Sequence, residues 1–459
     1  MQRKIKLATR RLTTLAAYGF FFATLALLIG QEYPVPGAFE TKISRAVGAQ
    51  LFDFVEWTLD AWREKAAQIA VPLDRYLSDN QRSKFVLDFM QLMRDYWQYE
   101  AQVRQIYAKE SGEAAATDSA DLRAKRDAVR AEIEQRRPTA EAIIQQQISS
   151  VLVDEGFGVG GEVFPPVAVR ITPLPYILIV SPRDEIRRDL SEGLETGLNV
   201  DQAEALETRV LSETNRSALV VPIGGLADYP AMILESTELL FLLQTCSHEW
   251  SHHWLYLRPL GYSYLAEDAP DVRTINETVA SVFGDEIGLK VMRRFYLDEL
   301  KRTFPDQVEP KPLTIPTPEP PQPPTASSNE QTFSYSRALH DTRVQVDKML
   351  AEARDFEKAG QTEQAQTKIV AAEDYMEQRR QYINTKLGAP VIRKLNQAYF
   401  AFYGAYADSP GAAGSDPVGP NVIALRVYSP TIREFMDRAS SVLTIERLQQ
   451  VVNDLKPKS

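Results

Sequence analysis

Three of the four histidines in the sequence stand close together, at His248, His252 and His253. The segment His248-Glu249-Trp250-Ser251-His252 has the form H-E-x-x-H, so on a helix its two histidines share one face, about 5–6 Å apart. Two imidazoles placed in this way can bind one divalent metal ion, and Glu249 lies where it can take a proton from a water on that ion. The motif predicts a hydrolase with Zn²⁺ as its cofactor. The alternative is a helix that carries two histidines and a nearby acid without any metal.

The surrounding sequence favours the metal-binding interpretation. The motif lies in an apolar segment that we expect to be helical from an N-cap at Ser236, with Glu238 in the first turn, to about Leu257. A second helix, expected from about Asp271 to Tyr296, carries the segment 276–280 of sequence N-E-T-V-A. Small residues recur at every fourth position of that second helix, which predicts close packing, against the motif helix in particular: Ala280, Gly284 and Gly288.

These two segments resemble the gluzincin family of zinc metallopeptidases, in which H-E-x-x-H is followed by a helix with N-E-x-x-A or N-E-x-x-S. The chain is also similar to a bacterial group of predicted aminopeptidases, through Tyr256 four residues after His252 and through the segment L-N-Q-A at 395–398. The resemblance covers about residues 217–296, with a weaker echo at 393–436. It implies His248 and His252 as metal ligands, Glu249 as general base and Glu277 as third ligand.

The third ligand has rivals among the neighbouring residues. His253 is next to His252 and therefore projects about 100° away around the helix. Three acids are nearer the motif than Glu277 but stand in a loop or at its edge, where position is harder to hold: Glu267, Asp268 and Asp271. Glu277 is expected one turn into a helix, and a rigid element suits a metal ligand. We therefore predict His248, His252 and Glu277 as the ligand set.

The sequence departs from the gluzincin pattern at Ser281, where many members carry an aspartate that orients a ligand histidine. Asp285, one turn further on, is the candidate carboxylate to replace it, and Asn276 is another candidate for contact with the metal ligands from behind. No G-x-M-E-N segment is present, so the sequence gives no support for exopeptidase specificity.

Two tyrosines, Tyr399 and Tyr403, are candidates to stabilise the oxyanion that forms on a substrate carbonyl, although core packing is the simpler interpretation of each. The segment 218–223 is a candidate edge strand on which an extended peptide could pair, and a buried strand is the competing interpretation. Residues 176–180 are the best candidate for a central strand.

The spacing of apolar residues and prolines predicts an α+β, mostly helical protein. The resemblance to gluzincins implies that its core is a zincin-like metallopeptidase fold. We expect a basic cytoplasmic tail at 1–11, a transmembrane anchor at 12–31, a helical region at 32–155 and the core at 156–303. A Pro-rich linker at 304–332, a helical hairpin insertion at 333–388 joined at Gly360, and a C-terminal helical part of the catalytic unit at 389–459 complete the chain. Within the last part, helices are expected at 396–407 and 430–455.

The N-terminal residues predict where in the cell the protein is located. Five basic residues and no acid precede an uncharged stretch, Leu12 to Gln31, that is long enough to cross a bilayer as a helix. A cleaved signal peptide is the competing interpretation, but no small-x-small cleavage site follows. The catalytic part would then lie outside the cytoplasmic membrane, in a bacterial cell envelope. A single cysteine, Cys246, excludes an intrachain disulfide, and a net charge of −10 gives no support for nucleic-acid binding.

The sequence thus predicts a membrane-anchored zinc peptidase that cleaves a peptide or protein substrate outside the membrane. The competing hypothesis is a catalytically inert scaffold with a metallopeptidase-like fold, which would recruit a protein partner through its helical region and the hairpin at 333–388.

Overall fold

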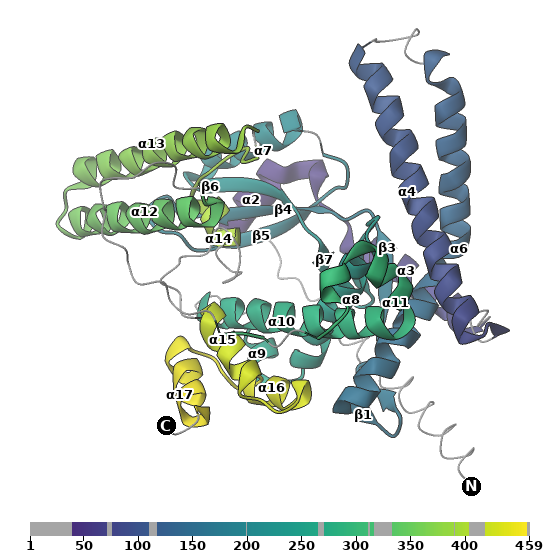
Figure 1. The fold of residues 1–459 in the computed structure, drawn as a ribbon. Coiled ribbons are helices and arrows are strands. Elements are labelled where there is room, and N and C mark those ends of the chain that lie inside the picture. The colour runs from purple at the N-terminus through teal and green to yellow at the C-terminus, as the bar shows by residue number, and fades with distance from the viewer. Residues whose placement is uncertain are drawn as a thin grey trace.

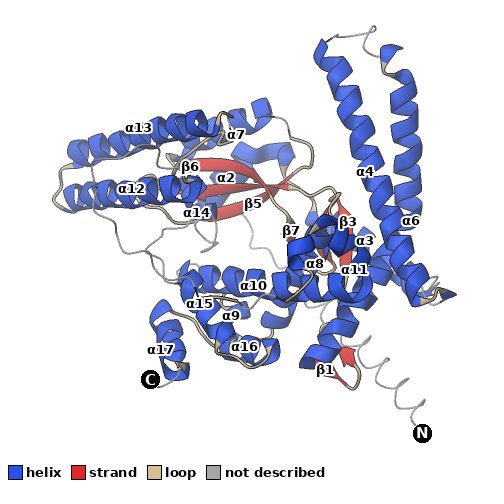
Figure 2. Ribbon diagram, viewed as in Figure 1, coloured by secondary structure: helices blue, strands red, loops and turns tan. Residues whose placement is uncertain are grey.

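The computed structural model describes residues 39–70, 76–109, 117–198, 200–264, 270–310, 313–315, 333–389, 391–403 and 418–456. The predicted anchor at 12–31 and most of the predicted Pro-rich linker lie outside these residues. None of the described helices is both long enough and apolar enough to span a membrane. The described chain is mostly helical with small sheets, so the α+β class expected from the sequence is confirmed (Figure 2).

The region before the sheets is helical, as the spacing of its apolar residues predicts. Helices α2 (Phe39–Val47) and α3 (Phe54–Ala70) are followed by two long antiparallel helices, α4 (Asp79–Lys109) and α6 (Ala120–Leu152). We call the α4–α6 pair the arm; it projects from the rest of the molecule in Figure 1. Phe89, Met93, Ile133 and Ile144 lie between its helices and join the main hydrophobic core.

Two three-stranded sheets follow the arm. In the first, β3 (Val169–Thr172) runs parallel to β8 (Ala231–Leu234), and β7 (Gly225–Leu226) pairs antiparallel with β8 as the edge strand. In the second, β4 (Tyr176–Ser181) is central between β5 (Leu190–Leu194) and β6 (Ser217–Pro222). The expected central strand is therefore present as β4. The segment predicted at 218–223 forms most of β6, which is the last strand of its sheet but is buried at all except its final residue, as the competing interpretation of a buried strand expected. A short β1–β2 pair (Gly158–Val159 and Glu162–Val163) follows the arm.

The second sheet is covered on both faces because its central and edge strands are apolar on both sides. Leu178, Val180 and Val220 pack toward α2 and α7 (Val200–Thr214), a helix that the sequence analysis did not foresee. Ile179 and Leu219 face the opposite way, into a separate core formed with the hairpin. Because successive side chains of a strand point to opposite faces, this one sheet contributes side chains to two separate hydrophobic cores.

The predicted hairpin is present as α12 (Tyr335–Lys358) and α13 (Thr362–Leu387). Gly360 between them has φ +74°, a conformation that glycine adopts without the strain of a Cβ. The described helices of the segment 389–459 divide between two cores: α14 (Gln397–Tyr403) packs with the hairpin, while α15 (Val418–Val427), α16 (Ile432–Ala439) and α17 (Ile445–Leu455) pack in the main core. The single helix expected at 430–455 is wrong, because Thr444 begins a new helix by accepting a hydrogen bond from the backbone N–H of Arg447.

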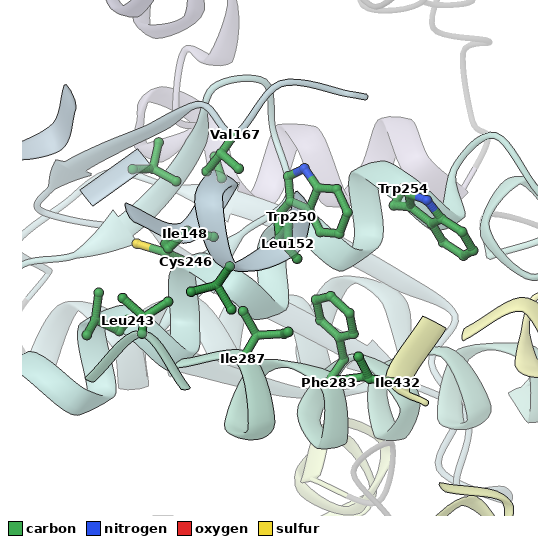
Figure 3. Close-up of a cluster of buried hydrophobic side chains, with 14 of the residues drawn as sticks. Ile148, Leu152, Val167, Leu243, Cys246, Trp250, Trp254, Phe283, Ile287 and Ile432 are labelled. Atoms are coloured by element: carbon green, nitrogen blue, oxygen red, sulfur yellow. The ribbon is translucent and has the colours of Figure 1, made fainter. Parts of the chain in front are cut away.

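Helices α8 (Leu239–Leu255) and α10 (Pro270–Phe295) lie side by side and carry the two segments singled out in the sequence. Glu238, not Ser236, is the N-cap residue of α8. The Ser236 hydroxyl accepts a hydrogen bond from the backbone N–H of Glu238, just before the helix begins. Figure 3 shows the apolar side chains that join α8 and α10 to their neighbours, Trp250 and Phe283 among them.

The small-residue stripe on α10 faces α8, as predicted. A Cβ added to Gly284 would come within 2.9 Å of the Cβ of His248, and one added to Gly288 within 2.6 Å of the backbone nitrogen of Gln244. Real Cβ atoms do not approach backbone so closely, so only glycine lets the helices come this near. The segment between the two helices contains the short helix α9 (Pro259–Tyr262), and α11 (Leu297–Thr303) follows α10.

Candidate metal centre

The two motif histidines project from one face of α8, as residues four apart on a helix must. Their Nε2 atoms lie 3.0 Å from each other and their rings are 4.8 Å apart between centroids. One turn of helix therefore presents two imidazole lone pairs to the same point.

Glu277 reaches that point from α10. Its Oε2 lies 3.4 Å from Nε2 of His248 and 3.6 Å from Nε2 of His252. Ligands bound tetrahedrally to one ion at 2.0–2.1 Å are about 3.3 Å apart, so the three atoms already have the spacing that one tetrahedral metal ion requires. Among the described residues these three form the group of histidines and acids that could hold a metal ion.

The charges in the cluster also suit a cation. The carboxylate of Glu277 is buried, which alone would raise its pKa, but the two imidazoles hold that pKa well below its usual value. Burial alone would lower the pKa of His252, yet the adjacent Glu277 raises it to about 9. The site therefore retains positive charge next to a buried carboxylate, and a metal ion can supply that charge instead of a proton.

Glu249 lies beside this cluster and against the edge strand of the first sheet. A Cβ at Gly225 of β7 would overlap Oε1 of Glu249, so the absent side chain makes room for the carboxylate. Burial, together with the nearby charge of Glu277, raises the pKa of Glu249 above its usual value, against the opposing effect of the two histidines. A carboxylate with a raised pKa is a stronger base, as a proton acceptor requires.

The orienting contact for His252 comes from Asn276. Nδ1 of His252 lies 2.8 Å from Oδ1 of Asn276, whose amide in turn donates to the backbone oxygen of Leu260 at 3.1 Å. With its amide nitrogen committed in this way, Asn276 offers an acceptor to the Nδ1–H of His252, and Nε2 keeps its lone pair for a metal. Asp285, the other candidate orienting residue, is exposed on α10. Of the two candidates, Asn276 is therefore the one that contacts a motif histidine.

Asn276→Ala is expected to weaken zinc binding about 10–100-fold, because His252 loses the acceptor that fixes its tautomer and ring orientation. Asn276→Asp retains an oxygen at the same position and should bind zinc more tightly than Asn276→Ala. Competition with a chelator of known zinc affinity measures the difference, and Asp285→Ala serves as the matched control on the same helix. Unchanged affinity in Asn276→Ala would show that His252 is oriented by another group.

The rival ligands lie elsewhere or outside the described residues. Nε2 of His253 is 2.7 Å from the backbone oxygen of Asp228, its ring packs on Tyr229, and burial lowers its pKa to about 4. Asp271 accepts a hydrogen bond from the backbone N–H of Ile445 at 3.5 Å. The two loop acids, at positions 267 and 268, are not among the described residues.

A tyrosine that the sequence analysis missed contacts the cluster. The hydroxyl of Tyr264 donates to Oε1 of Glu277 at 2.5 Å, and its ring lies 6.1 Å from that of His252. Burial raises the pKa of Tyr264, so the hydroxyl stays protonated at neutral pH. Nothing in the sequence marks this residue, because it follows α9 in a turn and belongs to no spaced pattern.

The two tyrosines proposed as oxyanion stabilisers lie in the hairpin core. The hydroxyl of Tyr399 is 3.3 Å from that of Tyr335, and the rings of Tyr399 and Tyr403 are 4.5 Å apart. Both belong to α14, which packs on β4 and β6. In the described part of the chain, the tyrosine hydroxyl with a hydrogen bond to the cluster is that of Tyr264, through Glu277.

Comparison of the chain with protein-family models, with curated proteins and with solved structures gives no match. The likeness to gluzincins therefore rests on the motif residues and their spacing.

Proposed function

We propose that the protein is a zinc-dependent peptidase of the gluzincin type, with His248, His252 and Glu277 as ligands and Glu249 as general base. The observation that carries the proposal is the triangle of ligand atoms, 3.0–3.6 Å on a side, with a buried carboxylate next to it. A chance pair of histidines on a helix would need neither a third ligand from another helix nor an orienting amide.

The residues of the chain suggest how such a reaction would proceed. Zn²⁺ in this site would polarise a substrate carbonyl and lower the pKa of a bound water to about 7. Glu249 would take the proton from the attacking water and pass it to the leaving amine. Asn276 holds His252 in position, and Tyr264 holds one carboxylate oxygen of Glu277 so that the other faces the histidines.

A peptide is the substrate class that the surroundings of Glu249 favour. β7 pairs with β8 on one side and is the last strand of its sheet, and Gly225 within it borders Glu249. An extended peptide added to this edge would bring its backbone past the general base. The edge strand that supports the proposal is therefore β7, whereas the segment at 218–223 lies in the other sheet.

Removal of the metal should abolish hydrolysis reversibly. Full-length protein in detergent, incubated with a peptide library, is expected to cleave peptide bonds, to lose that activity after dialysis against a chelator and to regain it with one equivalent of zinc. Mass spectrometry of the products measures the cleavage and its position. Cleavage that survives complete metal removal would contradict the proposal.

The inert-scaffold hypothesis keeps one observation in its favour: the hairpin exposes apolar side chains that a partner could cover, including Val344, Val370 and Tyr382. Under that hypothesis zinc binds but no library peptide is cleaved. The same experiment therefore separates the two functions.

We also propose that residues 12–31 anchor the protein in the cytoplasmic membrane, with its catalytic part outside. Protease added to intact spheroplasts should then digest the bulk of the chain, and the isolated protein should retain its first 30 residues. Full protection from the protease, or a mature N-terminus near Glu32, would contradict this topology.

A further inference from the structure

A cavity of about 440 Å³ lies between the arm and the ends of both sheets. We call it the arm cavity. The arm supplies one wall through Tyr96 and Trp97 of α4 and Arg130 of α6. The ends of the strands and their connections supply the other wall, which includes Leu174, Tyr176, Ile223 and Leu234. The cavity therefore joins a region outside the gluzincin-like segments to the region that carries them.

The lining suits a large apolar side chain. Besides its aromatic rings it contains three prolines, at positions 173, 175 and 222. Its two charged residues neutralise each other, because Arg130 and Glu235 form an ion pair with 2.8 Å between nitrogen and oxygen. The guanidinium of Arg130 also lies 5.5 Å from the centre of the Tyr96 ring, which holds that wall in place. A ligand group in the cavity would thus meet mostly rings and apolar atoms.

The position of the cavity relative to Glu249 gives it a candidate role. Ile223, which lines the cavity, stands two residues before Gly225, which borders Glu249. Leu234, another lining residue, donates its backbone N–H to the oxygen of Gly224 at 3.1 Å. Two residues of chain span at most about 7 Å, and the chain bends at Gly224 between them, at the rim of the cavity. A peptide paired along β7 would therefore pass the rim of the cavity within about two residues of the bond at Glu249, close enough for one of its side chains to enter.

We infer that the arm cavity is a specificity subsite that binds a large apolar or aromatic side chain of the substrate peptide, about two residues to one side of the cleaved bond. The inference rests on the proposed peptidase function and extends it to the substrate. It assigns the arm a role in selection of the substrate, with Trp97 as the residue that the side chain contacts most directly from α4.

The test measures selectivity in cleavage and in binding. Two peptides that differ only by phenylalanine or alanine at the second position from the cut are compared, and the zinc-loaded wild type should favour phenylalanine in kcat/KM. Trp97→Ala should reduce that preference about tenfold, chiefly through KM, and Thr196→Trp, at an exposed position of the lining, should block the cavity. Tyr76→Ala removes an exposed aromatic of the arm region outside the cavity and is the matched control.

The second readout needs no catalysis. Zinc-loaded Glu249→Gln should bind the uncleaved phenylalanine peptide more tightly than the alanine peptide in fluorescence anisotropy, and Trp97→Ala in the same background should remove the difference. Cleavage whose preference is the same in wild type, Trp97→Ala and Thr196→Trp would overturn the subsite and leave the peptidase standing. Selective binding that depends on Trp97 without any cleavage by the wild type would support the subsite and overturn the peptidase. If the protein shows no selectivity for phenylalanine in binding or in cleavage, the subsite is overturned.

Discussion

Glu249→Gln is expected to lose peptide hydrolysis by about 10²–10⁴-fold while it keeps its zinc. The amide has nearly the shape of the carboxylate, so it still fits against Gly225, but it cannot accept a proton from the attacking water. The ligand atoms of His248, His252 and Glu277 are untouched by the change. Zinc content by atomic emission and turnover of a single defined peptide, measured on the same preparation, test both halves of this expectation.

A control on the same helix is available in Gln244→Glu, which adds a carboxylate one turn before His248 and should leave turnover within a few-fold of wild type. Near-normal turnover in Glu249→Gln with zinc bound would move proton transfer to another group. Loss of zinc together with turnover would make Glu249 a determinant of metal binding and leave its role as a base without support.

The second large effect concerns the third ligand. Glu277→Ala is expected to reduce the zinc affinity by more than the 10–100-fold typical of an orienting residue, because it removes one of three protein ligands and the only negative charge among them. His253→Ala should still bind about one zinc ion per chain, since the His253 ring contacts Asp228 and Tyr229. Titration of the purified apoproteins with zinc against a competing chelator measures both.

Because His253 is buried, its variant must be shown to be folded, for which circular dichroism suffices; Asp271→Asn offers a less buried control among the acids near the motif. Stoichiometric zinc in Glu277→Ala combined with its loss in a folded His253→Ala would reverse the assignment of the ligands.

The elements that position the site could largely be predicted from the sequence. The expected second helix, from Asp271 to Tyr296, differs by one residue at each end from α10, and the stripe through Gly284 and Gly288 correctly indicated the face that packs on α8. Such features are local: apolar spacing and the absence of side chains act within one or two turns of helix. The N-cap was predicted at Ser236 because serine is a common N-cap residue. In the structure the Ser236 hydroxyl instead bonds to the backbone of Glu238, and Glu238 is the N-cap residue.

The contacts that complete the site could not be predicted, because they depend on where the chain returns in three dimensions. Tyr264 contacts Glu277 because the turn after α9 folds back over α10, and no spacing in the sequence encodes that return. Asn276 is part of the N-E-x-x-A segment, but its hydrogen bond to His252 depends on how far α10 is shifted along α8, which the sequence does not reveal. Tyr399 and Tyr403 were weighed for their chemistry, and their placement in the hairpin core follows from the packing of α14 on β4 and β6.

The two glycines of α10 that face α8 have a consequence for how such a site is recognised. The distance between the candidate ligands on α8 and the candidate ligand on α10 depends on the absence of side chains at Gly284 and Gly288, which lets the two helices pack closely. A search that scores residues by their chemistry passes over both positions, since neither has a side chain to score. A designer who copied only the imidazoles and carboxylates onto another pair of helices would therefore leave the helices too far apart for the three side chains to meet at one ion. The two glycines must be copied with them.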